Sequence, residues 1–167
     1  MSDVVIRPAR KGDGEGMAVA WLDAGRTYAE LDPELFRVPD SKHVADSMES
    51  WIAEPPGENE ALVVAEVEGG VVGLVSLRLE GPAPNPEAQL VLDVTEVRLF
   101  VDGLVVAEAF RRRGVGTRLM QAADEWGRTR GARLAVLDTW GESPESVPFY
   151  ERLGYAPRSI RFRKRLD

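Results

Sequence analysis

The chain of 167 residues carries 21 Lys and Arg against 28 Asp and Glu, a net charge of −7, and 44% of its residues are hydrophobic. This length favours a single domain over residues 1–167 with a continuous core, and the acidic balance argues against nucleic acid as a partner, because a phosphate backbone binds basic surfaces. Cysteine is absent, which excludes a catalytic thiolate and a Cys-ligated zinc. His43 is the single histidine, which excludes a multi-His site, so no metal is expected.

The N-terminal segment lacks the apolar core of a signal peptide, and no run approaches the ~18 apolar residues of a membrane span. We therefore predict a cytoplasmic chain without membrane contact. A short β-branched run at residues 4–9 contains Pro8, which cannot donate to a sheet ladder, so an edge strand is predicted there. Apolar residues at helical spacing then predict helices over residues 17–31 and 41–52, with Ser41 as the N-cap of the second.

The middle of the chain is predicted to be β-structure. Residues 61–68 and 71–79 flank Gly69-Gly70, which is a signal for a two-residue hairpin turn. A further extended stretch covers residues 89–106, and Gly103 within it predicts a bulge. The alternation of this stretch predicts one face with Val97, Leu99, Val101 and Val105, and an opposite face with Glu96, Arg98 and Asp102.

The C-terminal third alternates between helix and strand. Helical spacing predicts helices over residues 115–130, with Gly131 as the C-terminal cap, and 143–153, and residues 134–137 form an apolar run typical of a buried strand. Residues 158–166 are basic and alternating, and they are interpreted as a final charged strand or the edge of a homodimer. The order of these elements indicates one α/β domain with a mixed sheet.

The strongest chemical signal is the turn before the helix that starts at residue 115, which reads Arg111-Arg112-Arg113-Gly114-Val115-Gly116-Thr117. A helix N-terminus leaves backbone N–H groups unpaired and carries a partial positive charge. Gly114 and Gly116 remove side chains that would hold a phosphate away from the backbone. Three consecutive arginines oppose the helix dipole, so stability alone does not select them. The turn is interpreted as a receptor for a pyrophosphate or a similar dianion.

Other interpretations of this turn differ in what they require. A G-x-G before a helix is also compatible with a plain tight turn. Two nucleotide-binding motifs are excluded by spacing, because the turn has no Walker lysine and Leu119 stands where a dinucleotide fingerprint has its third glycine.

Two motifs carry a resemblance to a known family, the GCN5-related N-acetyltransferase (GNAT) superfamily. Its motif A, written (R/Q)-x-x-G-x-(G/A) after a strand, resembles Val101-Asp102-Gly103-Leu104-Val105-Val106 followed by the turn from Arg111 to Gly116. Its motif B resembles Phe149-Tyr150-Glu151-Arg152-Leu153-Gly154-Tyr155. The resemblance implies an acyl-CoA N-acyltransferase fold: a mixed, mostly antiparallel central sheet flanked by helices, in which two parallel strands splay apart.

The resemblance also implies acetyl-CoA as co-substrate, bound between the splayed strands. The backbone of residues 104–106 would pair with the pantetheine arm, and the turn would hold the pyrophosphate. The family has Asn seven residues before the motif B tyrosine, where this chain has Ser143. The acceptor, a small-molecule or peptide amine, would approach across the two N-terminal helices. The expected cofactor-binding residues are Leu104, Val105, Val106, Arg111, Arg112, Arg113, Gly114, Val115, Gly116, Thr117, Ser143 and Tyr150.

Acyl transfer from a thioester to an amine requires a neutral nucleophile. An alkyl amine of pKa ~10.4 is neutral only about one part in a thousand near pH 7, so a general base assists. Asp102 beside the expected bulge is the first candidate base and Glu96 on the same strand face is the second, although either is also compatible with a solvent-facing carboxylate. The family pattern places Tyr150 where it would protonate the departing thiolate. Without a cysteine to carry an acyl group, the sequence favours direct transfer in a ternary complex.

Two other functions fit parts of the sequence. A non-catalytic acyl-CoA-binding or sensing module would keep the turn without turnover, and Ser143 and Ser146 depart from the family pattern. A nucleic-acid-binding protein would use the arginine turn and the basic C-terminal residues, against the acidic balance of the chain. The sequence favours the N-acetyltransferase.

Overall fold

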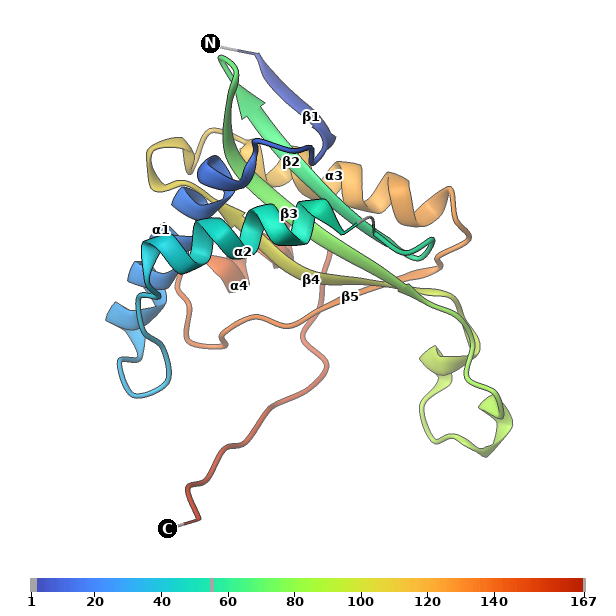
Figure 1. Ribbon diagram of the computed structural model, residues 1–167. Coiled ribbons are helices and arrows are strands. Elements are labelled where there is room, and N and C mark those ends of the chain that lie inside the picture. The colour runs from blue at the N-terminus through green and yellow to red at the C-terminus, as the bar shows by residue number, and fades with distance from the viewer. Residues whose placement is uncertain (1–2, 55, 167) are drawn as a thin grey trace.

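The computed structural model describes residues 3–54 and 56–166. Its strands form a single five-stranded sheet in the order β1-β2-β3-β4-β5 (Figure 1). The pairings from β1 to β4 are antiparallel, whereas β4 and β5 run parallel, so the expected mixed, mostly antiparallel sheet is confirmed. The strands are β1 (Val4–Pro8), β2 (Glu60–Val67), β3 (Gly70–Glu80), β4 (Arg98–Val106) and β5 (Leu134–Leu137).

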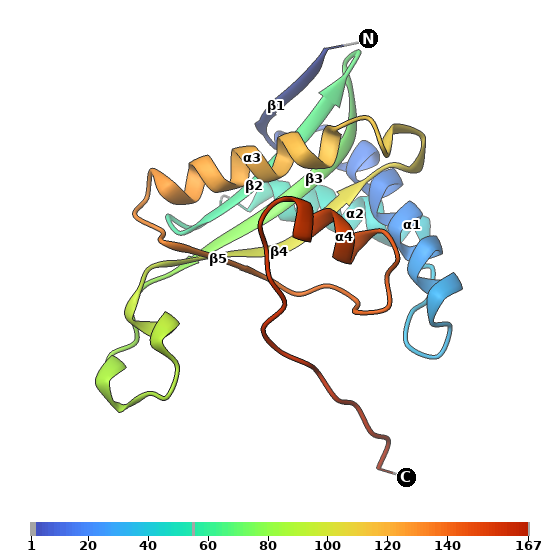
Figure 2. The same ribbon diagram turned by 180° about the vertical axis from the view of Figure 1, so that it is seen from behind.

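Helices cover both faces of the sheet. On one face lie α1 (Gly14–Leu31) and α2 (Ser41–Ala53); α3 (Val115–Arg128) crosses the other, and the short α4 (Ser146–Arg152) lies near the end of β4 (Figures 1 and 2). No helix in the described ranges is long and apolar enough to cross a bilayer.

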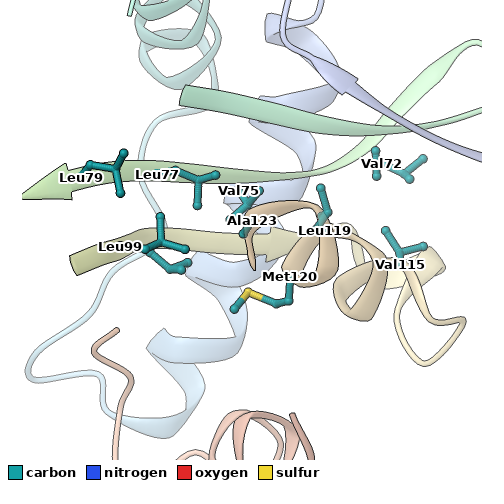
Figure 3. Packing of buried hydrophobic residues seen from close by; sticks show 11 residues of the cluster. Val72, Val75, Leu77, Leu79, Leu99, Val115, Leu119, Met120 and Ala123 are labelled. Carbon is teal, nitrogen blue, oxygen red and sulfur yellow. The ribbon is translucent and has the colours of Figure 1, made fainter. Parts of the chain in front are cut away.

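The core is split by the sheet into two apolar layers, because strand side chains alternate between faces. The layer under α3 is the larger, and Figure 3 shows α3 residues spaced by one helical turn packed on β3 and β4. The layer under α1 and α2 is built from the alternate residues of the same strands. The α3 layer includes Val75, Leu77, Leu99, Val101, Val115, Leu119, Met120 and Ala123; the other includes Met17, Leu22, Val44, Met48, Val64 and Leu74.

A bulge interrupts β4 where the glycine predicted it. Ser76 pairs with Gly103 and Leu77 with Val101, so Asp102 is the extra residue. One extra residue reverses the alternation beyond it. Val105 therefore packs under α1 and α2 and not on the face of Val101, which corrects the predicted pattern.

Two predicted boundaries are also corrected. The β2–β3 hairpin turns at Glu68 and Gly69, both at positive φ (50° and 82°), and Gly70 already pairs in β3, so the predicted Gly69-Gly70 turn is displaced by one residue. The N-cap of α2 is Asp40, whose carboxylate accepts the His43 N–H at 3.1 Å, and not Ser41.

The structure differs more from the predicted extended regions at residues 89–106 and 158–166. Residues 86–88 and 92–95 form short 3₁₀ turns, so β4 begins at Arg98 and Glu96 lies outside the strand. Residues 158–166 are exposed and carry no helix or strand, so the predicted final strand is not formed within this chain.

Arg7 joins β1, β2 and the start of α1. Its guanidinium donates to both oxygens of Asp13 at 2.7 and 2.8 Å and to Glu66 at 2.6 and 2.8 Å. Its side chain is 15% exposed and that of Asp13 is 8% exposed, so solvent does little to replace these contacts. Hydrogen bonds from Arg7 lead the causes that lower the pKa of Asp13 below its usual 3.8.

We expect Arg7→Ala to reduce the free energy of unfolding by about 3 kcal/mol, because it leaves two part-buried carboxylates unpaired. The contribution of Asp13 is present above pH ~4 and is lost as the pH falls through its lowered pKa. Urea denaturation at pH 7 measures the effect. The matched control is Arg10→Ala, since Arg10 is 68% exposed and contacts Glu66 only at 3.4 Å, and it should stay within about 0.5 kcal/mol of the parent.

Candidate active site

A groove of about 370 Å³ opens between the C-terminal half of β4, the arginine turn and α4. Figure 2 shows α4 beside this end of the sheet, close to the start of α3. The groove contains most of the predicted cofactor-binding residues, although they come from three separate elements. It is lined by Leu104, Val106, Arg111, Arg112, Gly114, Gly116, Thr117, Glu145, Ser146, Phe149, Tyr150 and Arg152.

The parallel strands diverge below this groove. Their pairing ends at Val101 with Leu137, whereas β4 continues to Val106, so the backbone of residues 104–106 has no β5 partner on that edge. Leu104 and Val106 line the groove, whereas Val105 packs in the α1–α2 layer and its carbonyl oxygen lies beside Gly73 of β3, so Val105 does not line it. The expected splayed pair of strands is present.

The N-terminus of α3 is open. Gly114 adopts φ +80° as the N-cap, and no side chain of the described residues caps the helix. The first intrahelical bond runs from Arg118 N to Gly114 O at 3.0 Å, so the preceding amides of the first turn have no helical acceptor. They lie at the positive end of the helix dipole, and two of their residues, Gly116 and Thr117, line the groove. Val115 is 2% exposed as a whole residue and packs in the core, so it does not line the groove.

The three arginines of the turn have different environments. Arg111 donates to Val106 O at 3.0 Å and to Thr27 Oγ1 at 2.9 Å, so it fixes the turn to β4 and α1. Arg112, at φ +60°, lines the groove. The guanidinium carbon of Arg113 lies 5.5 Å from the centroid of the Phe110 ring, and Arg113 does not line the groove. Of these three arginines, Arg112 alone both lines the groove and has a guanidinium without a hydrogen bond, ion pair or ring contact to the described residues.

Tyr150 lies at the inner wall of the groove on α4. Its ring contacts Phe149 and Tyr155 with centroids 5.1 and 5.9 Å away. Burial, with a smaller contribution from neighbouring Tyr28, raises the pKa of Tyr150 to about 12. The phenol is therefore protonated at neutral pH and can only donate its proton there.

Ser143 has a local role. It is 6% exposed; its hydroxyl donates to Ser146 Oγ at 2.9 Å and accepts the Ser146 N–H at 3.1 Å. Ser143 thus stabilises the start of α4 and does not line the groove, whereas Ser146 does.

The two candidate bases are separated by the structure. Asp102 is exposed at the bulge, two residues from Leu104, and its carboxylate oxygens accept from Arg78 Nε and Nη2 at 3.2 Å each. Glu96 is exposed and precedes the far end of β4, and the six residue-to-residue steps from Arg98 to Leu104 alone span about 20 Å. The prediction that both carboxylates share one strand face near the site is wrong for Glu96.

Aromatic side chains that the sequence analysis did not single out stand beside Tyr150. Phe36, in the α1–α2 connection, contacts Tyr28 at 5.0 Å and Trp140 edge-on at 5.5 Å. The Tyr28 hydroxyl lies 3.5 Å from Ser146 Oγ, which places this aromatic wall at the groove. Trp140 and Ser146 lie more than a hundred positions from Tyr28 and Phe36 in sequence, so only tertiary structure brings them together. The connecting segments also carry the carboxylates Asp32, Glu34, Asp138, Glu142 and Glu145.

A mixed sheet whose parallel pair opens beside an uncapped helix N-terminus defines an acyl-CoA N-acyltransferase fold. The chain matches the model of the Acetyltransferase (GNAT) family over residues 25–155. It belongs to this family, and it is an acyltransferase.

Individual relatives agree with the family. The chain is 30% identical over 129 residues to aminoglycoside N(6')-acetyltransferase type 1 of Salmonella typhimurium, covering 76% of this chain and 82% of that protein. The structure of AAC(6')-Iy in complex with a bisubstrate analogue, CoA-S-monomethyl-acetylneamine, is 27% identical with a TM-score of 0.62, covering 99% of this chain and all of that one. The BH1408 protein of Bacillus halodurans, at 17% identity and a TM-score of 0.81 over 97% of this chain and 99% of that one, is similar in fold.

Proposed function

We propose that the protein transfers an acetyl group from acetyl-CoA directly to a primary amine of a small cationic acceptor. The observation that carries the proposal is the open N-terminus of α3, where unpaired amides and Arg112 face a groove that leads to Tyr150. Such an arrangement suits an elongated ligand with a diphosphate at one end and a reactive group at the other.

In this proposal each part of the groove has one task. The amides of Gly116 and Thr117, with Arg112, bind the diphosphate, and the β4 edge at Leu104, which has no β5 partner, pairs with the pantetheine arm. Ser143 is assigned to the support of α4 and not to a contact with pantetheine. Backbone N–H groups freed by the bulge at Asp102 would polarise the thioester carbonyl.

The reaction then needs two proton movements. The amine nitrogen attacks the thioester carbon, a C–N bond forms and the C–S bond breaks. Asp102, directly or through water, accepts the proton that the amine loses, and Tyr150 donates its hydroxyl proton to the departing sulfur. The raised pKa of Tyr150 keeps that proton in place until the sulfur gains negative charge.

Two observations support a small cationic acceptor. The segments around the aromatic wall of Tyr28, Phe36 and Trp140 are rich in carboxylates, and aromatic faces and carboxylates both attract ammonium groups. The relative from Salmonella typhimurium is named for an aminoglycoside acceptor, which is a polyamine. A peptide amine is the other acceptor class to be tested.

The test is a thiol-release assay with acetyl-CoA against a panel of monoamines, polyamines, aminoglycosides and peptides. The proposal expects release that depends on an amine and is fastest with multiply charged acceptors. CoA binding without release for any amine would favour the sensing module. Binding to nucleic acid that persists in ~0.2 M salt and resists free CoA would favour the nucleic-acid alternative.

Arg112→Ala is expected to weaken CoA binding about tenfold, because a charge-assisted hydrogen bond to the diphosphate is lost. Calorimetric titration measures the change. Arg113→Ala is the matched control, since it removes the same charge from the neighbouring residue, which stacks on Phe110 outside the groove. Equal losses in both variants would show that the turn acts only as a diffuse positive charge.

A further inference from the structure

Charged side chains surround one aromatic ring on β3 and β4, next to the bulge. Leu77, Leu99 and Val101 pack in the α3 layer, so the alternate residues of these strands point to the opposite face of the sheet, which carries α1 and α2. This charged row consists of Arg78, Glu80, Arg98, Phe100 and Asp102.

Arg78 is joined to Asp102 by two hydrogen bonds. Its Nε donates to one carboxylate oxygen of Asp102 and its Nη2 donates to the other, each at 3.2 Å. Such a fork fixes the orientation of a carboxylate as well as its distance. Asp102 is the extra residue of the bulge and is left out of the regular pairing of β3 and β4, so the sheet itself does not fix its side chain.

Arg78 is itself held by its neighbours. Its Nη1 donates to one carboxylate oxygen of Glu80, and the other oxygen of Glu80 accepts from Arg98 Nη2 at 3.1 Å. The guanidinium carbon of Arg78 lies 4.5 Å from the centroid of the Phe100 ring, within the range of a cation–π contact. These contacts restrict the guanidinium, so its fork stays directed at Asp102.

The bulge also adjoins α1 and the groove. A Cβ added at Gly103 would lie 3.9 Å from Trp21 Cζ3, so α1 packs beside the backbone next to Asp102. Leu104, two residues after Asp102, lines the groove. The side chain of Asp102 is 46% exposed and could turn in several directions, and the fork of Arg78 selects one of them.

We propose that Arg78 is a positioning residue for the transfer reaction: it holds the Asp102 carboxylate in the direction from which it accepts the proton of the attacking amine. This inference rests on the proposed function, in which Asp102 is the base. Each carboxylate oxygen has two lone pairs, so one on each remains free for that proton. Arg78 does not line the groove and is assigned no contact with CoA.

A double-mutant cycle separates positioning from a purely structural role. The variants are Arg78→Gln, Asp102→Asn and the two combined, and thiol release with the acceptor found by the amine panel gives kcat. We expect kcat to fall about tenfold in Arg78→Gln and about 100-fold in Asp102→Asn, with the CoA affinity from calorimetry within about twofold of the parent. The double variant should match Asp102→Asn within about twofold, because Arg78 then has no base to position, whereas independent losses would multiply to about 1,000-fold.

Arg78→Lys tests the fork and not the charge. Lysine keeps the positive charge but cannot form two parallel hydrogen bonds to one carboxylate, so its kcat should lie within about threefold of that of Arg78→Gln. Arg98→Gln is the matched control, because its guanidinium carbon lies 5.5 Å from the Phe100 centroid and it bonds Glu80 in place of Asp102. Its kcat should stay within about threefold of the parent, and thermal unfolding checks that each variant is folded.

Three results would overturn the inference while leaving Asp102 as the base. They are parental kcat in Arg78→Gln, parental kcat in Arg78→Lys, and a double variant whose loss is the product of the single losses. Parental kcat in Asp102→Asn, or no amine-dependent release by the wild type, would refute the proposed function itself and overturn the inference with it.

Discussion

Replacing Tyr150 by phenylalanine should lower kcat by about 10²–10³-fold and leave the affinity for CoA within about twofold, because the ring still fills the groove wall and only the proton donor is lost. Steady-state thiol release with the amine identified by the panel gives kcat, and calorimetry gives the CoA affinity.

Since the pKa of Tyr150 is raised to about 12, the phenol stays protonated up to at least pH ~10, so any loss of wild-type activity below that pH must come from another group.

Tyr28→Phe is the matched control, because it removes a hydroxyl from the same aromatic wall, 3.5 Å from Ser146. We expect less than about a tenfold change in kcat for this variant. Unchanged turnover in Tyr150→Phe would refute the role of Tyr150 as the acid, even if CoA binding is intact.

Gly116→Val should weaken CoA binding by about 100-fold or more. A Cβ at this position would lie 3.3 Å from Phe149 Cζ and 3.8 Å from Val106 Cγ2, so the branched side chain fills the space between α3 and α4 where the diphosphate is to approach the amides. The affinity is measured by calorimetry, and thermal unfolding of the free protein reports any loss of packing.

Gly81→Val provides the comparison, because a Cβ at Gly81 meets no atom within 4 Å and that glycine lies outside the groove. It should bind CoA as the parent does. Parental affinity in Gly116→Val would place the diphosphate elsewhere.

The turn that precedes α3 could be located from the sequence because its parts are contiguous. The turn from Arg111 to Thr117 supplies glycines, charges and a helix N-terminus within seven residues, and local rules suffice for such a unit. The bulge could be located from Gly103 for the same reason. The change of face at Val105 could not be predicted in this way. The face of a strand residue follows from its position in the alternation, and the bulge inserts one extra residue into that alternation.

Other parts of the site depend on contacts between distant residues. The wall of Tyr28, Phe36 and Trp140 joins three segments, and no local pattern relates them. Asp23 accepts the Glu108 N–H at 2.8 Å and Thr27 accepts from Arg111, so α1 also positions the turn. Residues 158–166 show the reverse case: their alternation predicts a strand, yet a strand forms only where another edge pairs with it.

Calorimetric titration of the wild type with CoA and with pantetheine tests the central claim most directly, because pantetheine keeps the thiol arm and lacks the diphosphate. The α3 amides and Arg112 predict that CoA binds at least about 100-fold more tightly than pantetheine. Equal affinities for the two, or no detectable binding of CoA, would contradict the account.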